Sequence, residues 1–323
     1  MADDARQVRN TGIEKQLAAA TVTAYEVWQL PTGRAGVLDS PNSVLSTNYF
    51  DQRFDGQWTF TKSTTFSALK GGRAYWDHSA NAVLYKKVND RDFYLGRFAE
   101  DASQTSSSCL IDLNADPAYD IDFLRDGFLS VPTGTQAIGG FGLPKLFGGA
   151  RLFELTATSE AQCIDYLSVD RFSVDANAIA EFILRVPTNG TTSAVDFNVG
   201  IANGTSTTDA DAVTEHVLFH IDGASTAINA QSKDTSTTVA ATDTTTTFTA
   251  GSAVANRVEL WIDTRDKTSV VIYVNGVRVL SGTTFPLTAA TGPLGLLIHL
   301  EKTSSTATGQ FVIDAARAHY AEQ

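Results

Sequence analysis

The sequence predicts an all-β protein, with a small N-terminal β-barrel followed by a C-terminal antiparallel jelly-roll sandwich. Short runs of β-branched and aromatic residues recur along the 323 residues, with Gly, Asn and Asp between them. No run has the apolar spacing of a helix that buries one face. The length is comfortable for two domains, and a hydrophobic content of 43% is enough for a sizeable core.

Four parts are expected in chain order. Residues 1–20 are charged and then Ala-rich, which predicts an N-terminal arm that is either mobile or docked on a neighbouring subunit. Residues 21–114 are expected to form the barrel, 115–150 an ordered connector, and 151–323 the sandwich. The barrel strands are expected at 21–30, 34–38, 49–54, 58–61, 73–76, 82–86, 93–98 and 109–113. The sandwich strands are expected at 152–157, 162–168, 178–186, 194–201, 216–221, 227–233, 257–263, 269–274, 277–281, 294–301 and 310–319.

Two segments stand out within this plan. The run at 270–281 predicts a β-hairpin, because Asn275–Gly276 is the preferred pair for a type I′ turn and β-branched or aromatic residues flank it. The connector carries too many large apolar groups for a solvated tether, so it is expected to pack on its own domains or across a subunit interface. The groups expected at that interface are Phe123, Leu124, Phe128, Phe141, Leu143 and Phe147.

The composition and net charge of the chain argue against several classes of function. A net charge of −12 and a pI near 4.8, without any Lys/Arg-rich run, argue against binding to nucleic acid or to an anionic membrane. The N-terminus has no apolar stretch typical of a secretory signal, and no run approaches the roughly 20 apolar residues of a membrane span. Synthesis and folding in a cytoplasm are expected. Cys109 and Cys163 lie in different halves and are expected to be buried structural thiols.

Candidate catalytic residues are few, and the chain is expected not to be an enzyme. Glu259 and Asp263 are spaced to share one strand face, but no third carboxylate completes a glycosidase motif, so an outward polar face is expected. His216 and His220 could also share a strand face, yet the Glu of the zinc-protease signature is missing between them. His299 is isolated in its strand, and no Ser–His–Asp or Cys–His arrangement is indicated.

Metal and cofactor binding are not expected, with one weaker alternative. Oxygen donors in or near loops of the second domain are calcium candidates, although their spacing matches no fixed calcium loop. These candidates are Asn203, Asp209, Asp211 and Asp222. The Thr-rich run at 234–249 is expected to be an exposed strand and loop.

The N-terminal half resembles a known family. Its phrases are LPTGRAGVLDS, WTFTKS, GGRAYWDHSANAV at 71–83 and FYLGRFAEDASQTSSSCLIDLN at 93–114. Over residues 20–114 these phrases resemble, in order and content, small bacteriophage β-barrel proteins that decorate or cement capsids. The resemblance implies a virion structural protein on the capsid exterior, commonly trimeric, with the major capsid protein as its partner.

The C-terminal half is similar to the concanavalin-like lectin and glucanase fold, of which laminin G modules are a branch. The similarity rests on FNVGIANG, HVLFHIDG, NRVELWIDTRDKTSVVIYVNGVRV, GPLGLLIHLEK and FVIDAARAHYAEQ. That fold hosts lectins, glycosidases and structural modules, so it implies architecture and not activity.

The expected function is therefore a phage capsid decoration protein that cements the capsid exterior, as a homotrimer where major capsid subunits meet. It would be made in the host cytoplasm and located on the virion. The alternative is a carbohydrate-binding head fibre or adhesion protein whose C-terminal domain holds host-surface glycans. The sequence leaves open the oligomeric state, the capsid site, the host, and whether the second domain binds a glycan or a cation.

Overall fold

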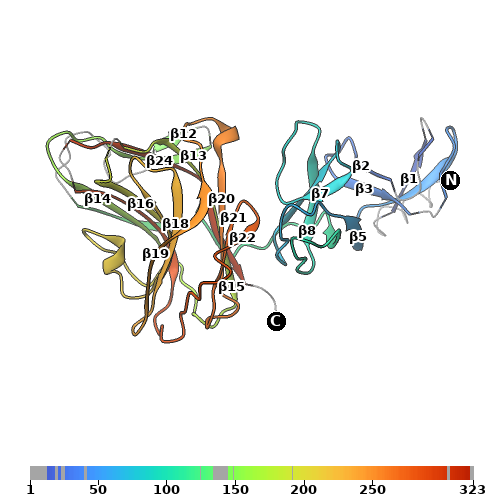
Figure 1. The fold of residues 1–323 in the computed structure, drawn as a ribbon. Helices are drawn as coiled ribbons and strands as arrows, with labels where there is room; N and C mark the ends of the chain where they lie inside the picture. The colour runs from blue at the N-terminus through green and yellow to red at the C-terminus, as the bar shows by residue number, and fades with distance from the viewer. Residues whose placement is uncertain are drawn as a thin grey trace. The chain divides into compact units, whose positions relative to one another are not determined.

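The computed structural model confirms an all-β protein (Figure 1). The structure describes residues 13–18, 21–22, 26–39, 42–123, 125–133, 145–147, 149–190, 192–303 and 306–320. The chain forms two compact units, residues 1–118 and 119–323, each with its own hydrophobic core. The described part of the chain contains no helix whose length and apolar character would let it cross a membrane.

The first unit begins with a four-stranded antiparallel sheet. Its strands, in the order β1-β4-β3-β2, are β1 (Ile13–Leu17), β4 (Tyr49–Arg53), β3 (Ala35–Leu38) and β2 (Val27–Gln29). Ala18, Leu38 and Phe50 form a small apolar cluster against it. Strand β1 lies inside the segment expected to be an arm and pairs with β4 of the same chain, so residues 13–17 are an edge strand.

A second sheet of the first unit closes into a small barrel. Its order is β5 (Gln57–Thr61), β9 (Ser108–Leu113), β8 (Phe93–Phe98), β6 (Arg73–Asp77) and β7 (Ala82–Leu84). A parallel bridge between Lys62 and Val83 joins the two edges of this sheet. Phe66, Phe98 and Cys109 are buried inside it, and burial raises the pKa of the Cys109 thiol to about 12. Cys109 is thus the buried structural thiol that the sequence predicts.

The second unit is a sandwich of two antiparallel sheets (Figure 1). The eight-stranded sheet runs β12 (Lys145–Phe147), β13 (Ala150–Leu155), β24 (Gly309–Tyr320), β15 (Ala178–Thr188), β20 (Val258–Asp263), β21 (Val271–Val274) and β22 (Val277–Val279), and β10 (Ile121–Asp122) also pairs with β24. The seven-stranded sheet runs β11 (Phe128–Thr133), β14 (Gln162–Ser168), β23 (Gly295–Lys302), β16 (Val195–Ala202), β17 (His216–Asp222), β18 (Ala227–Lys233) and β19 (Thr238–Thr247).

The sandwich core lies between these sheets because side chains alternate along each strand. Phe182, Phe197, Phe219 and Phe311 are at most 1% exposed and belong to one continuous cluster. The expected hairpin is confirmed: β21 and β22 pair antiparallel, and Asn275 and Gly276 both have positive φ (50° and 77°), as a type I′ turn requires.

The segment expected to be a connector supplies strands to the sandwich. Residues from 119 onward belong to the second unit, and β10, β11 and β12 pair within its sheets. Phe123 is buried and lies edge-on to Phe128 (ring centroids 4.9 Å) and to Tyr166 (5.6 Å). These two of the six expected interface residues therefore pack inside the sandwich. Leu124, Phe141 and Leu143 lie outside the described residues, and Phe147 lies in β12, without a described side chain.

Candidate functional site

The face of the seven-stranded sheet that points away from the core, here the outer face, carries the candidate site. Strand β16 explains why: Phe197, Val199 and Ile201 are buried in the core, so Asp196 and Asn198 point the other way. The pairing register aligns the outward residues of five strands in two rows. The first row is Asp165, His299, Asn198, His220 and Asn229. The second row is Cys163, Glu301, Asp196 and Asp222.

His299 is the centre of the buried part of these rows. Its Nδ1 lies 3.0 Å from Asp165 Oδ1 and its Nε2 lies 3.4 Å from Glu301 Oε2, and the ring is fully buried. Burial alone opposes a charged imidazole, but the hydrogen bonds to Asp165, Cys163 and Glu301 raise the pKa of His299 well above its usual value. The imidazolium therefore neutralises part of the carboxylate charge around it.

Cys163 lies beside His299 but is not arranged as a nucleophile. Its Sγ is 3.9 Å from Nε2 and 4.0 Å from Nδ1, and both nitrogens already face carboxylates. Burial raises the pKa of the Cys163 thiol, so the unreactive thiol form is favoured. Cys163 is buried as expected, although its surroundings are polar.

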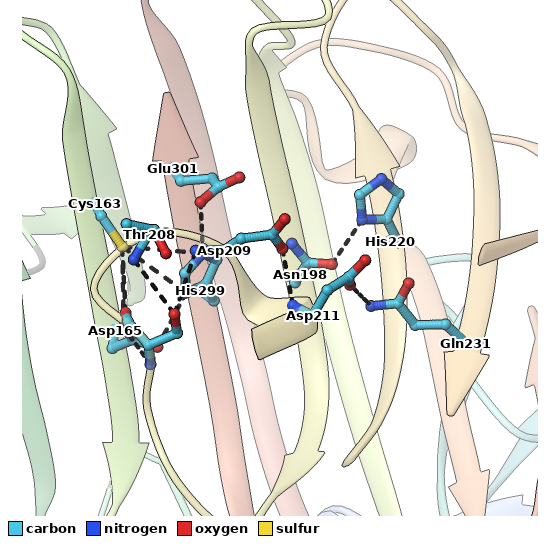
Figure 2. A network of polar contacts seen from close by, with 11 residues as sticks. Cys163, Asp165, Asn198, Thr208, Asp209, Asp211, His220, Gln231, His299 and Glu301 are labelled. Carbon is cyan, nitrogen blue, oxygen red and sulfur yellow. Dashed lines mark hydrogen bonds and ion pairs between the residues drawn. The ribbon is translucent and has the colours of Figure 1, made fainter. Parts of the chain in front are cut away.

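A loop at 203–215 covers one end of the outer face. The backbone N–H of Ser206 donates to Asp165 Oδ2 at 3.1 Å. Gln231 donates to Asp211 Oδ1 (Figure 2). Below the loop, Ala210 and Val213 pack on the outward residues Leu167, Leu218 and Leu297. The loop therefore separates a buried end of the face from a half-exposed end.

The half-exposed end is built around His220. Its Nδ1 lies 2.8 Å from Asn198 Oδ1 and its Nε2 lies 3.0 Å from Asp222 Oδ1. The side chains of His220 and Asp222 are 15% and 44% exposed, so solvent and ligands can reach them. Asn229 Nδ2 lies 3.5 Å from Asp222 Oδ2.

Asp196 joins the two ends of the face. It lies directly opposite Glu301 on β23, and burial together with the charges of Glu301 and Asp222 raises the pKa of Asp196 to about 7. Its Oδ1 atom is buried and has no hydrogen-bond partner among the described residues. Within the described part of the chain, the ion pairs of Asp165, Glu301 and Asp222 involve His299 or His220 and no Lys or Arg. The face is thus strongly acidic.

The calcium candidates occupy two places. Asn203, Asp209 and Asp211 lie on or beside the covering loop, where Asn203 Oδ1 accepts from Thr214 Oγ1 at 3.3 Å and Asp209 Oδ1 accepts from the backbone N–H of Asp211 at 2.8 Å. Asp222 is on β17, beside His220. The structure therefore uses the first three in loop turns, and only Asp222 lies at the His220 cluster.

The other sequence candidates lie elsewhere. Glu259 and Asp263 are on the face of β20 opposite its core residues, as expected, and Asp263 pairs with Arg265 at 2.6 Å. His216 is buried under the loop, its Nδ1 lies 3.1 Å from the Val213 carbonyl oxygen, and burial lowers its pKa to about 4. It takes no part in the His220 cluster.

Most residues of the two rows could not be assigned to one site from the sequence. Asp165, Asn198 and His299 each stand alone between apolar neighbours and lie between 33 and 134 residues apart in the sequence, so only the pairing register brings them together. The available signal was the polar residue at alternate positions in CIDYLS, VDFNVG and IHLEK, which marks an outward face but not its neighbours.

Two groups of side chains have metal-ligating atoms within 4.8 Å of one another, in the part of the chain that is described. One is buried and consists of Cys163, His299 and Glu301. The other is half-exposed and consists of Asp196, His220 and Asp222.

Comparisons with known proteins give neither a family nor a curated relative, since no family model and no curated protein matches the chain. The resemblance of residues 20–114 to capsid decoration proteins thus has no support from a family model. Several solved structures are similar over the larger part of the chain. One, from work on endo-acting O-glycanases with which human gut microbiota initiate mucin breakdown, is 10% identical, and the match covers 64% of this chain and 100% of that one with a TM-score of 0.46.

Two further structures are similar to a comparable extent. The potassium-bound carbohydrate recognition domain of Emp46p is 10% identical over 59% of this chain and 88% of its own, with a TM-score of 0.39. Alginate lyase PA1167 from Pseudomonas aeruginosa is 13% identical over 54% of this chain and 84% of its own, with a TM-score of 0.37. No residue role or activity is carried from these proteins to this chain.

Proposed function

We propose that the protein binds glycans, without cleaving them, at the half-exposed end of the outer face. The observation that carries this proposal is the alignment of Asp196, His220, Asp222 and Asn229 on neighbouring strands of one rigid sheet. Carboxylates, amides and imidazoles can accept hydrogen bonds from sugar hydroxyls, and side chains held on strands are fixed in advance, which lowers the entropic cost of binding.

The charge of the face favours neutral sugars. Carboxylates accept hydrogen bonds strongly but repel anionic groups, and no Lys or Arg pairs with the carboxylates of this face among the described residues. Uncharged hexose or N-acetylhexosamine chains fit this pattern better than uronate or sulfated chains.

The carboxyl groups of the face are not arranged as a glycosidase pair. Retaining enzymes hold two carboxyl groups roughly 5–5.5 Å apart, and inverting enzymes hold them farther apart, on either side of the scissile bond. Asp196 and Glu301 instead lie opposite each other on neighbouring strands of one sheet face, and Glu301 is buried, so the two carboxyl groups do not flank a bound sugar. Glu259 and Asp263 belong to the other sheet. We therefore expect no release of reducing sugar from neutral polysaccharides.

A glycan array with the full chain tests the proposal. Binding should be confined to neutral glycans, and Asn229→Ala should weaken a hit at least about tenfold because one positioned hydrogen-bond donor and acceptor is lost. Asp175→Asn is the matched control, since Asp175 pairs with Lys267 and lies outside the outer face. A chain that binds no glycan, or an Asn229→Ala variant with full affinity, would contradict the proposal.

Capsid decoration is a second proposal, and the two-unit organisation favours it. The first unit has its own buried cluster around Phe66 and Phe98, so it could attach to a lattice while the second unit holds a glycan. Co-sedimentation of the full chain with empty phage heads tests attachment, and a chain that stays in the supernatant argues against it. This test is independent of glycan binding.

A further inference from the structure

Three metal-ligating side chains meet at the half-exposed end of the outer face with the spacing of a coordination shell. One ligand atom from each of Asp196, His220 and Asp222 lies within 4.8 Å of the others. The distance from His220 Nε2 to Asp222 Oδ1 is 3.0 Å. Adjacent ligands of an octahedral ion with bonds of about 2.1 Å are separated by about 3.0 Å.

The neighbouring amides orient two of these ligands. Asn198 Oδ1 lies 2.8 Å from His220 Nδ1 and is placed to accept an N–H from it, and in that tautomer the lone pair of Nε2 points towards Asp222. Asn229 approaches the other carboxylate oxygen of Asp222. In the same tautomer, two acceptors face each other at 3.0 Å and attract a cation between them.

Asp196 gives a second and independent reason. Its Oδ1 is buried and lacks a hydrogen-bond partner among the described residues. A buried carboxylate oxygen without a partner is costly, so such atoms generally have a proton donor or an ion beside them. No Lys or Arg side chain ion-pairs with Asp196 or Asp222 within the described ranges.

We propose that Asp196, His220 and Asp222 bind one divalent first-row transition-metal ion, with Zn²⁺ or Mn²⁺ as the fitting chemistry. One imidazole nitrogen with two carboxylates suits such ions better than Ca²⁺, which prefers oxygen ligands alone. The 44% exposure of Asp222 leaves positions for water on the solvent side. The site shares only Asp222 with the calcium candidates of the sequence, and it goes beyond glycan binding without depending on it.

The buried group of Cys163, His299 and Glu301 is the competing location. Both nitrogens of His299 already face carboxylates, and the whole group is buried on the outer face, where the loop at 203–215 contacts Cys163 through Ser206. The test must therefore distinguish an ion bound with a thiolate from one bound without it.

Titration calorimetry of the chelator-stripped full chain with Zn²⁺ tests the site, with Ca²⁺ as the comparison ion. We expect one Zn²⁺ per chain, at least about 100-fold tighter than Ca²⁺, and a loss of at least about tenfold in affinity in Asp222→Asn and His220→Gln. Asp175→Asn and Cys163→Ser should bind as the parent does. If His220→Gln fails to fold, the near-isosteric Asp222→Asn decides.

Co²⁺ then reports the ligands. Its near-ultraviolet spectrum should lack the thiolate-to-cobalt charge-transfer band, because no sulfur belongs to the proposed site. The proposal is overturned by the absence of Zn²⁺ binding, by full affinity in Asp222→Asn, or by a thiolate band that disappears in Cys163→Ser. None of these measurements involves a glycan, so their outcome is separate from that of the glycan array.

Discussion

In both sandwich sheets, side chains point alternately into the core and outward along each strand. The two outward faces differ in how their charged side chains are paired. On the eight-stranded sheet, Arg185 forms a bidentate pair with Asp314 (2.7 and 3.0 Å), and Arg317 pairs with Glu181 at 2.9 Å. On the seven-stranded sheet, the ion-pair contacts of Asp165, Glu301 and Asp222 are made with His299 and His220, and no Lys or Arg takes part in them among the described residues. A face whose charges are paired internally serves stability, whereas a face with surplus carboxylates can serve a ligand.

The largest expected loss of stability comes from breaking a buried ion pair on the outward face of the eight-stranded sheet. Arg185→Met should lower the free energy of unfolding of the second unit by about 2–3 kcal/mol, because the buried carboxylate of Asp314 loses its bidentate partner and keeps only the partly exposed Arg257 at 2.6 Å. The side chains of Arg185 and Asp314 are only 5% and 6% exposed, which excludes water as a substitute. Denaturant unfolding measures the loss.

The control for this change is an exposed pair in the same unit. Lys267→Met breaks the pair with Asp175, whose side chain is 68% exposed, and should cost less than about 1 kcal/mol. Equal losses in the two variants would show that burial does not set the strength of these pairs.

The second effect concerns the proton that Asp196 binds on the acidic face of the seven-stranded sheet. The pKa of Asp196 is about 7 in the folded chain, against 3.8 as its ordinary value, so the folded state holds this proton longer than the unfolded state does. Stability is therefore lost as pH rises from about 4 to about 7. Asp196→Asn removes this dependence, and its unfolding free energy should rise relative to the parent by about 2 kcal/mol over that window, after allowance for partial solvation.

Unfolding curves at several pH values, recorded with a chelator present, measure this difference. Other titrating groups such as His216 and His299 are present in both proteins, so their effects largely cancel in the comparison. A difference that stays constant between pH 4 and pH 7 would contradict the raised pKa of Asp196.

The sequence predicted the fold well because local signals specify it. The alternation in 178–186 and 216–221 and the Asn275–Gly276 turn follow from side-chain period and backbone sterics, which act over a few residues. It missed β11, because a Pro weakens the strand signal there, whereas β19 lies in the Thr-rich run at 234–249 where an exposed strand was expected.

The site was less accessible to prediction than the fold. His220 was noticed only beside His216, and Asp222 only as an oxygen donor near a loop, although both lie in β17. Asp196 and His299 come from other strands, and their approach depends on a pairing register that a single sequence does not encode locally. The first unit shows the same limit, since the bridge from Lys62 to Val83 that closes its sheet has no local signature.

The smallest expected change in stability, in Asp222→Asn, gives the clearest test of the difference between the two outward faces. Asp222→Asn keeps the shape of a side chain that is 44% exposed and removes only its charge, so the free energy of unfolding should stay within about 0.5 kcal/mol of the parent. The same change should abolish tight Zn²⁺ binding, because it removes an anionic ligand from the cluster with Asp196 and His220. Denaturant unfolding and calorimetry on one preparation measure both quantities. A large loss of stability would mean that Asp222 supports the fold through His220, as Asp314 does through Arg185. The carboxylates of both faces would then serve stability.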